Sequence, residues 1–188
     1  MTYLAISCRC LLGSVFLVSA VTKISGRASF QAYARSVRRL GVSRPAFAAA
    51  APAALVTCEL AVAAQLASPL RAVAVSGFAV ALALLAVFSA AIVRSLSRDE
   101  REPCRCFGAA GARLGWRHVV RNAALAGFAL LGIPGTVTPG GDQPAGYAVA
   151  AVIGLVVGLM ITQADRFMEL IRPREPYPSG HLPGQEGA

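Results

Sequence analysis

Two cysteines separated by a single residue are the group in this chain whose type and spacing best suit chemistry. Cys104 and Cys106 lie in the sequence Cys104-Arg105-Cys106-Phe107-Gly108. A disulfide between positions this close can form only through a small, strained ring. Because strain makes a disulfide easier to reduce, the pair favours thiol–disulfide exchange over a purely structural role. The adjacent Arg105 would favour the reactive thiolate form.

Two other interpretations of this C-x-C pair stay open beside redox exchange. A zinc site needs about four ligands. The segment offers two thiols and, further along, His118, without a second cysteine pair at suitable spacing. We therefore predict no metal. The remaining alternative is that both cysteines are incidental residues of a loop.

A second C-x-C pair, Cys8-Arg9-Cys10, lies in the first apolar segment. Cys104 and Cys106 follow the third apolar segment, so the two pairs belong to opposite membrane faces. The hydrocarbon between them is about 30 Å thick, whereas disulfide-bonded Cα atoms lie within about 7 Å. We therefore predict that Cys8 and Cys10 are small apolar helix residues, and that Cys58 in the second segment serves packing as well.

The elements that must position these residues are membrane helices. Of the 188 residues, 56% are hydrophobic and 14% charged, whereas a soluble domain carries about 25% charged residues. A helix needs about 20 apolar residues to cross a bilayer. The sequence predicts an all-α, polytopic bundle with a four-helix core, one further span and a membrane domain over residues 1–165. The five predicted spans are residues 4–22, 46–67, 72–93, 116–134 and 145–162.

The two ends of this domain have sequence features of their own. Val18-Ser19-Ala20 resembles a signal-peptide cleavage site, although no basic residue precedes Arg9. We therefore favour a retained first helix. Residues 166–188 are rich in proline and glycine and predict a disordered polar tail. In the last span, Ala150, Gly154 and Gly158 form a stripe of small residues typical of close helix packing.

Basic residues alternate between the two sides of the predicted membrane. Residues 23–44 hold six lysines or arginines and residues 94–121 hold seven, whereas residues 135–144 hold none. Positively charged loops stay in the cytoplasm. The pattern predicts an outside N-terminus, an inside C-terminus and a cytoplasmic C-x-C pair. Because the net charge of +9 forms no continuous stripe and aromatic residues are sparse, we predict contact with lipid and not with nucleic acid.

The first basic loop contains an amphipathic pattern. Phe30, Tyr33, Val37 and Leu40 recur at helical spacing, and arginines occupy the other face. This pattern predicts a short helix at the membrane interface, on the same side as the C-x-C pair. The alternative is a basic connector with accidental periodicity. The arginines of the polar face are Arg35, Arg38 and Arg39.

Glu59 falls within the second span, where a charge is costly unless it is paired or protonated. Lys23 and Arg121 lie towards the C-x-C side, and either would partner Glu59 if the depths match. Glu59 could be a proton carrier or part of a quinone site, or it could be a polar clasp within the bundle. Both interpretations stay open, and a quinone is the one cofactor that this residue suggests.

The element Cys104–Gly108, followed by Arg121-Asn122 at the opening of the next helix, resembles the methylamine utilisation protein MauE family, which is related to DoxX-like membrane proteins. The resemblance implies a membrane protein that matures methylamine dehydrogenase, whose small subunit is rich in disulfides, together with a thioredoxin-like partner. Cys104 and Cys106 would be the exchanging pair, although Arg105 stands where a smaller residue is expected. The supporting residues are Phe107, Gly108, Arg121, Asn122, Lys23 and Glu59.

We therefore predict a multi-pass protein of the cell membrane that acts as a thiol–disulfide redox or maturation factor, with oxidoreductase activity as an open question. One alternative is a non-catalytic assembly factor for a periplasmic or quinone-linked dehydrogenase, and another is a small transporter built around Glu59. Maturation of an exported protein implies that the dithiol lies outside, whereas the charge pattern favours the cytoplasm. Both sides stay open at this point.

Overall fold

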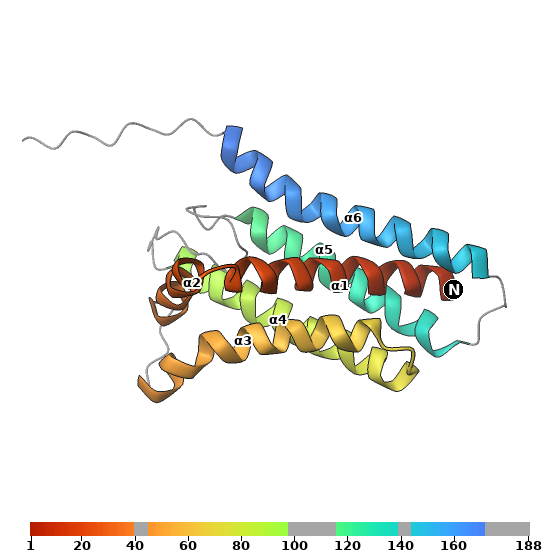
Figure 1. Ribbon diagram of the computed structural model, residues 1–188, viewed down its shortest axis with the longest axis horizontal. Coiled ribbons are helices and arrows are strands. Elements are labelled where there is room, and N and C mark those ends of the chain that lie inside the picture. The colour runs from red at the N-terminus through yellow and green to blue at the C-terminus, as the bar shows by residue number, and fades with distance from the viewer. Residues whose placement is uncertain (40–44, 98–115, 139–143, 172–188) are drawn as a thin grey trace, which may run out of the picture.

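The described part of the chain is a bundle of long helices. The computed structural model describes residues 1–39, 45–97, 116–138 and 144–171, and every regular element among them is helical. This confirms the predicted all-α class. The helices, arranged as in Figure 1, are α1 (Thr2–Ile24), α2 (Arg27–Arg39), α3 (Pro45–Ala67), α4 (Arg71–Ser97), α5 (Trp116–Val137) and α6 (Pro144–Ile171).

Five of these helices are long and apolar enough to cross a membrane, as predicted. They are α1, α4 and α5 over their full lengths, residues Ala50–Ala67 of α3 and residues Pro144–Ala164 of α6. The five run side by side along the long axis of the molecule (Figure 1). The chain is therefore a multi-pass membrane protein, and α5 spans despite the polar residues in its first turns.

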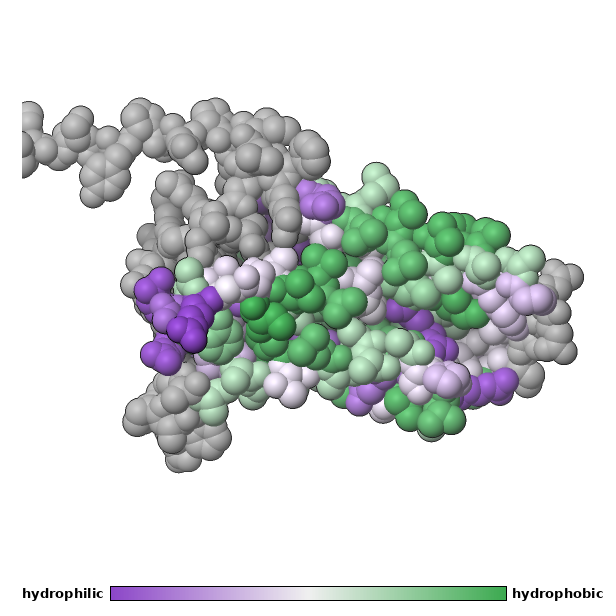
Figure 2. All heavy atoms as spheres, viewed as in Figure 1, coloured by the Kyte–Doolittle hydropathy of each residue, from purple (hydrophilic) through white to green (hydrophobic). Residues whose placement is uncertain are grey.

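Four helices form the core and the fifth lies outside it, which confirms the predicted arrangement. The core draws fully buried side chains from α1, α3, α4 and α5, among them Phe16, Val62, Phe78 and Leu125. Lipid tails are as apolar as these side chains, so close packing between the helices holds the bundle together. Figure 2 shows apolar side chains over much of the middle of the visible face, a group of hydrophilic side chains at the end formed by α2 and further hydrophilic side chains towards the opposite end.

The small residues of α6 pack against α1. Ser7 Oγ donates a hydrogen bond to the carbonyl oxygen of Ala150 at 2.8 Å. A Cβ added at Gly154 would lie 2.9 Å from the carbonyl carbon of Ser7, and one at Gly158 would lie 2.8 Å from the carbonyl oxygen of Leu11. Only glycine permits so close an approach of two helix backbones. The predicted stripe of small residues therefore serves contact within the chain.

Helix α2 caps one end of the bundle with its apolar face. Tyr33, Ala34 and Val37 are buried, whereas Arg35 and Arg38 are exposed. This confirms the amphipathic helix as far as Val37, whereas Leu40 of the predicted apolar face lies outside the described residues. The C-terminal ends of α1, α4 and α6 and the N-terminal ends of α3 and α5 gather here, and we name this the α2 end (Figure 1). The N-terminus and the α3–α4 connection lie at the opposite end, which we name the far end.

Two predictions concern residues near the limits of the structure. Helix α6 continues to Ile171, beyond the predicted end of the membrane domain at residue 165. The rest of the predicted tail, residues 172–188, lies outside the described residues. Residues 98–115 also lie outside them, although the two helix ends that this segment joins, Ser97 of α4 and Trp116 of α5, both belong to the α2 end.

Candidate functional site

The predicted exchange site is described only through its surroundings. Cys104, Cys106, Phe107 and Gly108 lie outside the described residues, so their roles stay predictions. The structure does describe the polar residues that the sequence associated with them. Lys23, Glu59, Arg121 and Asn122 all belong to the half of the bundle that ends at α2, the end at which the cysteine segment leaves α4 and enters α5.

Lys23 and Glu59 form a buried ion pair at this end. Lys23 Nζ bonds to Glu59 Oε1, which joins the last turn of α1 to the middle of α3. The two residues are 2% and 0% exposed. A cation in the last turn of a helix also meets the negative end of the helix dipole. The structure thus selects Lys23, and not Arg121, as the ion-pair partner of Glu59.

Ser19 completes the hydrogen bonding between the two charges. Lys23 Nζ donates to Ser19 Oγ at 3.1 Å, and Ser19 Oγ donates to Glu59 Oε1 at 3.2 Å. Ser19 precedes Lys23 by four residues, so one helix face presents both side chains to Glu59. One carboxylate oxygen therefore receives two donors. The three groups form a compact network between α1 and α3.

Two aromatic rings enclose the ammonium group of Lys23. Its Nζ lies 4.9 Å from the ring centroid of Tyr33 on α2 and 5.4 Å from that of Phe88 on α4. At such distances the electron-rich ring faces attract a cation, and the attraction is stronger where water is excluded. Because both rings are buried, they separate the ion pair from the surface of the α2 end.

The second oxygen of Glu59 and the amide of Asn122 are buried without hydrogen-bond partners among the described residues. The atoms concerned are Glu59 Oε2 and both Nδ2 and Oδ1 of Asn122, whose residue is 1% exposed. Buried polar atoms in folded proteins nearly always have a partner. The site therefore has unused capacity to accept and to donate hydrogen bonds.

The helix register places Asn122 at the level of this network. A Cβ added at Gly132 of α5 would lie 3.1 Å from the Cβ of Cys8 on α1, and it would also touch the ring of Phe78 on α4. Both α1 and α4 run antiparallel to α5 (Figure 1). Asn122 lies ten residues before Gly132 on α5. Because α1 and α4 run in the opposite direction, Asn122 is level with the residues that lie ten positions after Phe78 and Cys8. These residues are Phe88 and Val18, the neighbour of Ser19. Five helices thus contribute to one level of the bundle.

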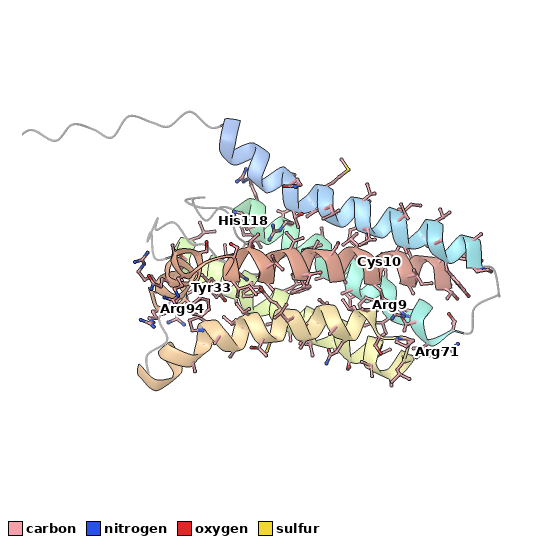
Figure 3. The ribbon with its side chains drawn as sticks, in the orientation of Figure 1. Arg9, Cys10, Tyr33, Arg71, Arg94 and His118 are labelled. Atoms are coloured by element: carbon pink, nitrogen blue, oxygen red, sulfur yellow. The ribbon has the colours of Figure 1, made fainter. Side chains whose placement is uncertain are left out.

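Arg121 and His118 occupy the first turns of α5. Both are partly buried and both have interaction partners. Figure 3 shows His118 at the start of α5, on the side of α6. These positions explain how α5 spans the membrane, because its polar residues lie close to the helix end and against other helices.

Arg9 forms a second polar site, near the far end. Its Nε donates to the carbonyl oxygen of Leu66 at 2.8 Å, and its Nη2 donates to that of Ser68. The last carbonyl groups of a helix have no partners within the helix. The planar guanidinium supplies two such bonds at once. Figure 3 shows Arg9 and Arg71 towards this end, far from Tyr33 and Arg94.

The cysteines outside the exchange segment have mixed outcomes. Cys8 is buried in the core and Cys10 is half-buried against Gly154 of α6, so both serve packing as predicted. The prediction for Cys58 is wrong, because this residue is exposed on the outer face of α3. A helix that is apolar on every side gives no sign of which face meets lipid.

The described structure also keeps the two C-x-C pairs apart. Cys8 lies at the level of Phe78, because Gly132 touches both. From Phe78, α4 continues for 19 residues to Ser97, where the segment with Cys104 begins. At 1.5 Å per residue this is roughly 28 Å. The level of Cys8 is therefore remote from the helix end at which the second pair leaves the bundle.

Ser19, Tyr33 and Phe88 were missed as parts of this site. Their spacing offered a partial signal, since Ser19 lies one helical turn before Lys23 and Tyr33 lies on the apolar face of α2. Phe88 gave none, because it is one of many apolar residues in α4. Among the described residues, no group of three or more His, Cys, Asp or Glu side chains could hold a metal ion.

Comparison with known proteins identifies the family. Neither the curated proteins nor the solved structures yield a significant match to this chain. The profile of the family described as methylamine utilisation protein MauE matches residues 1–135, more than two thirds of the sequence. The match covers α1 to α4 and nearly all of α5, and includes Lys23, Glu59, Asn122 and the segment with Cys104 and Cys106. The chain therefore belongs to the methylamine utilisation protein MauE family.

Proposed function

We propose that this chain is a membrane-embedded thiol–disulfide redox factor of methylamine utilisation that helps to mature a disulfide-containing protein. The observation that carries the proposal is a shared location. The family match includes Cys104 and Cys106, and the helices on either side of their segment end beside the buried polar network of Lys23 and Glu59. The helix ends that flank the proposed exchange pair thus belong to the same end of the bundle as this polar network.

The charges at the α2 end suit thiolate chemistry. Arg94 closes α4 before the cysteine segment, and Arg117 opens α5 after it. The positive end of the α5 helix dipole lies at Trp116. Cations and helix N-termini lower the cost of forming a thiolate, which is the nucleophile in disulfide exchange. The surroundings therefore favour reaction over a merely structural pair.

The exchange would proceed with a thioredoxin-like partner in two steps. A thiolate of Cys104 or Cys106 attacks a sulfur of the partner's disulfide, and the other partner sulfur leaves as a thiolate. The second cysteine of the pair then attacks the mixed disulfide and releases the partner as a dithiol. Two electrons pass from the chain to the partner, and the reverse sequence oxidises the partner instead.

Trapping the mixed disulfide tests this proposal. We expect that Cys106→Ser or Cys104→Ser abolishes maturation, and that one of the two variants accumulates a covalent complex that a reducing agent dissolves. Non-reducing electrophoresis with mass spectrometry identifies the partner and the linked cysteine. Cys58→Ser is the matched control, because Cys58 is an exposed thiol of the same chain outside the proposed site. Full maturation by the double serine variant would favour a non-catalytic assembly factor.

A further inference from the structure

At the level of Lys23 and Glu59 in the bundle, several buried polar atoms have no hydrogen-bond partner among the described residues. Glu59 Oε2 and both amide atoms of Asn122 have no partner among the described residues, although the two residues are 0% and 1% exposed. Leaving a buried polar group without a hydrogen-bond partner lowers the stability of a folded protein. Within a membrane bundle no bulk solvent is available to offset that loss. The three atoms are therefore candidates for contact with a bound group that supplies these bonds.

The chemistry of the three atoms defines the occupant. The carboxylate oxygen needs a donor, and the amide needs both a donor and an acceptor. Water offers both functions and is stable inside proteins where it finds two to four polar partners. The register of α5 against α1 and α4 brings Asn122 to the level of Ser19 and Phe88, where Glu59 is held.

We propose that water binds inside the bundle at Glu59 and Asn122, and that Glu59 exchanges a proton with it. A hydronium ion gives its proton to the Glu59 carboxylate and becomes water. Lys23 keeps its charge and its bond to Ser19. The site then changes from neutral to a single positive charge. The proposed water site involves described residues alone and does not require that the cysteines exchange disulfides.

The surroundings limit which groups can take part. Lys23 approaches from α1 and Tyr33 from α2, while α4 contributes the uncharged ring of Phe88. On α5, Arg121 and His118 lie one residue and about one turn nearer the helix start than Asn122. Among the described side chains, Glu59 is the only carboxylate at this level. Within the proposal, Glu59 is the carboxylate that takes up the proton.

Hydroxyl-radical footprinting of the whole protein in lipid nanodiscs tests the bound water directly. Radicals made by X-ray irradiation of water label buried side chains only where water lies beside them. Phe88 and Phe78 are a matched pair, since both are buried phenylalanines of α4 and only Phe88 lies at the Lys23 level. We expect Phe88 to be labelled several-fold faster than Phe78. Equally slow labelling of both rings would overturn the proposal.

A variant and an isotope experiment test the roles of Asn122 and Glu59. Asn122→Leu keeps the branching of the side chain and replaces the unsatisfied amide by methyl groups, so we expect a folded protein in which Phe88 labelling falls to the rate of Phe78. Infrared spectra in H₂O and D₂O should show a carboxylic acid band that appears as the pH falls, shifts on deuteration and disappears in Glu59→Gln. Unchanged Phe88 labelling in Asn122→Leu, or the same band in Glu59→Gln, would contradict the proposal.

Discussion

At the scale of single residues, the buried ion pair of Lys23 and Glu59 is a feature that close packing of the helices does not require. Removing both charges from water costs more than their attraction returns unless further bonds support them. Ser19 and the rings of Tyr33 and Phe88 supply part of that support. An apolar pair of similar size would be an equally stable contact. The charges are therefore better explained by function than by stability.

Replacing one partner of the pair tests how strongly the two charges depend on each other. Lys23→Met leaves Glu59 buried without its cation, and we expect a loss of about 3–5 kcal/mol in the free energy of unfolding. The double variant Lys23→Met/Glu59→Leu removes both charges and should recover most of this loss. Thermal or chemical unfolding in detergent, followed by circular dichroism, measures both values.

The control for the Lys23 and Glu59 variants is an exposed cation at the same end of the bundle. Arg38→Met changes a solvent-facing residue of α2 and should alter unfolding by less than about 0.5 kcal/mol. A double variant that is as unstable as Lys23→Met would contradict the coupling. In that case the apolar replacements, and not the unpaired charge, would explain the loss.

At the scale of helices, the sequence predicted what depends on local pattern and missed what depends on distant contacts. The lengths of the apolar segments predicted all five spans, and periodicity predicted α2. The contact of Lys23 with Phe88 brings together helices that are remote in sequence. No spacing of residues along the chain predicts such a contact. The α4 helix also runs four residues past its predicted end at residue 93, because Arg94 is favourable in a last turn.

The contact between α1 and α6 yields a test at this scale. Gly154→Leu would force a side chain against the backbone of Ser7 and the Cβ of Cys10, 3.0 Å from the added Cβ. We expect a loss of about 1–3 kcal/mol from overpacking and easier proteolysis of α6. Ala148→Leu, an exposed position of the same helix, is the control. Equal stability of both variants would show that α6 does not pack as described.

At the scale of the whole molecule, the two ends of the bundle differ in charge. The α2 end carries Arg27, Arg35 and Arg38 on α2, with Arg94 and Arg117 on the neighbouring helices. The described residues of the far end carry Arg9 and Arg71, and Arg9 donates hydrogen bonds to the carbonyl groups of Leu66 and Ser68. The orientation predicted from the sequence, in which the α2 end faces the cytoplasm, depends on these same charges and stays a prediction.

The direction of thiol chemistry depends on this orientation, and labelling in intact cells tests it. Gln31→Cys introduces an exposed thiol at the α2 end, and Leu70→Cys introduces one at the far end, where Leu70 is 64% exposed. With a membrane-impermeant maleimide we expect labelling of the Leu70→Cys variant alone. Lysed cells should label both and serve as the control. A cytoplasmic dithiol would then draw on the reduced thiol pool of the cell and pass electrons outwards through its partner. The opposite labelling would place Cys104 and Cys106 outside, where they could oxidise an exported protein directly.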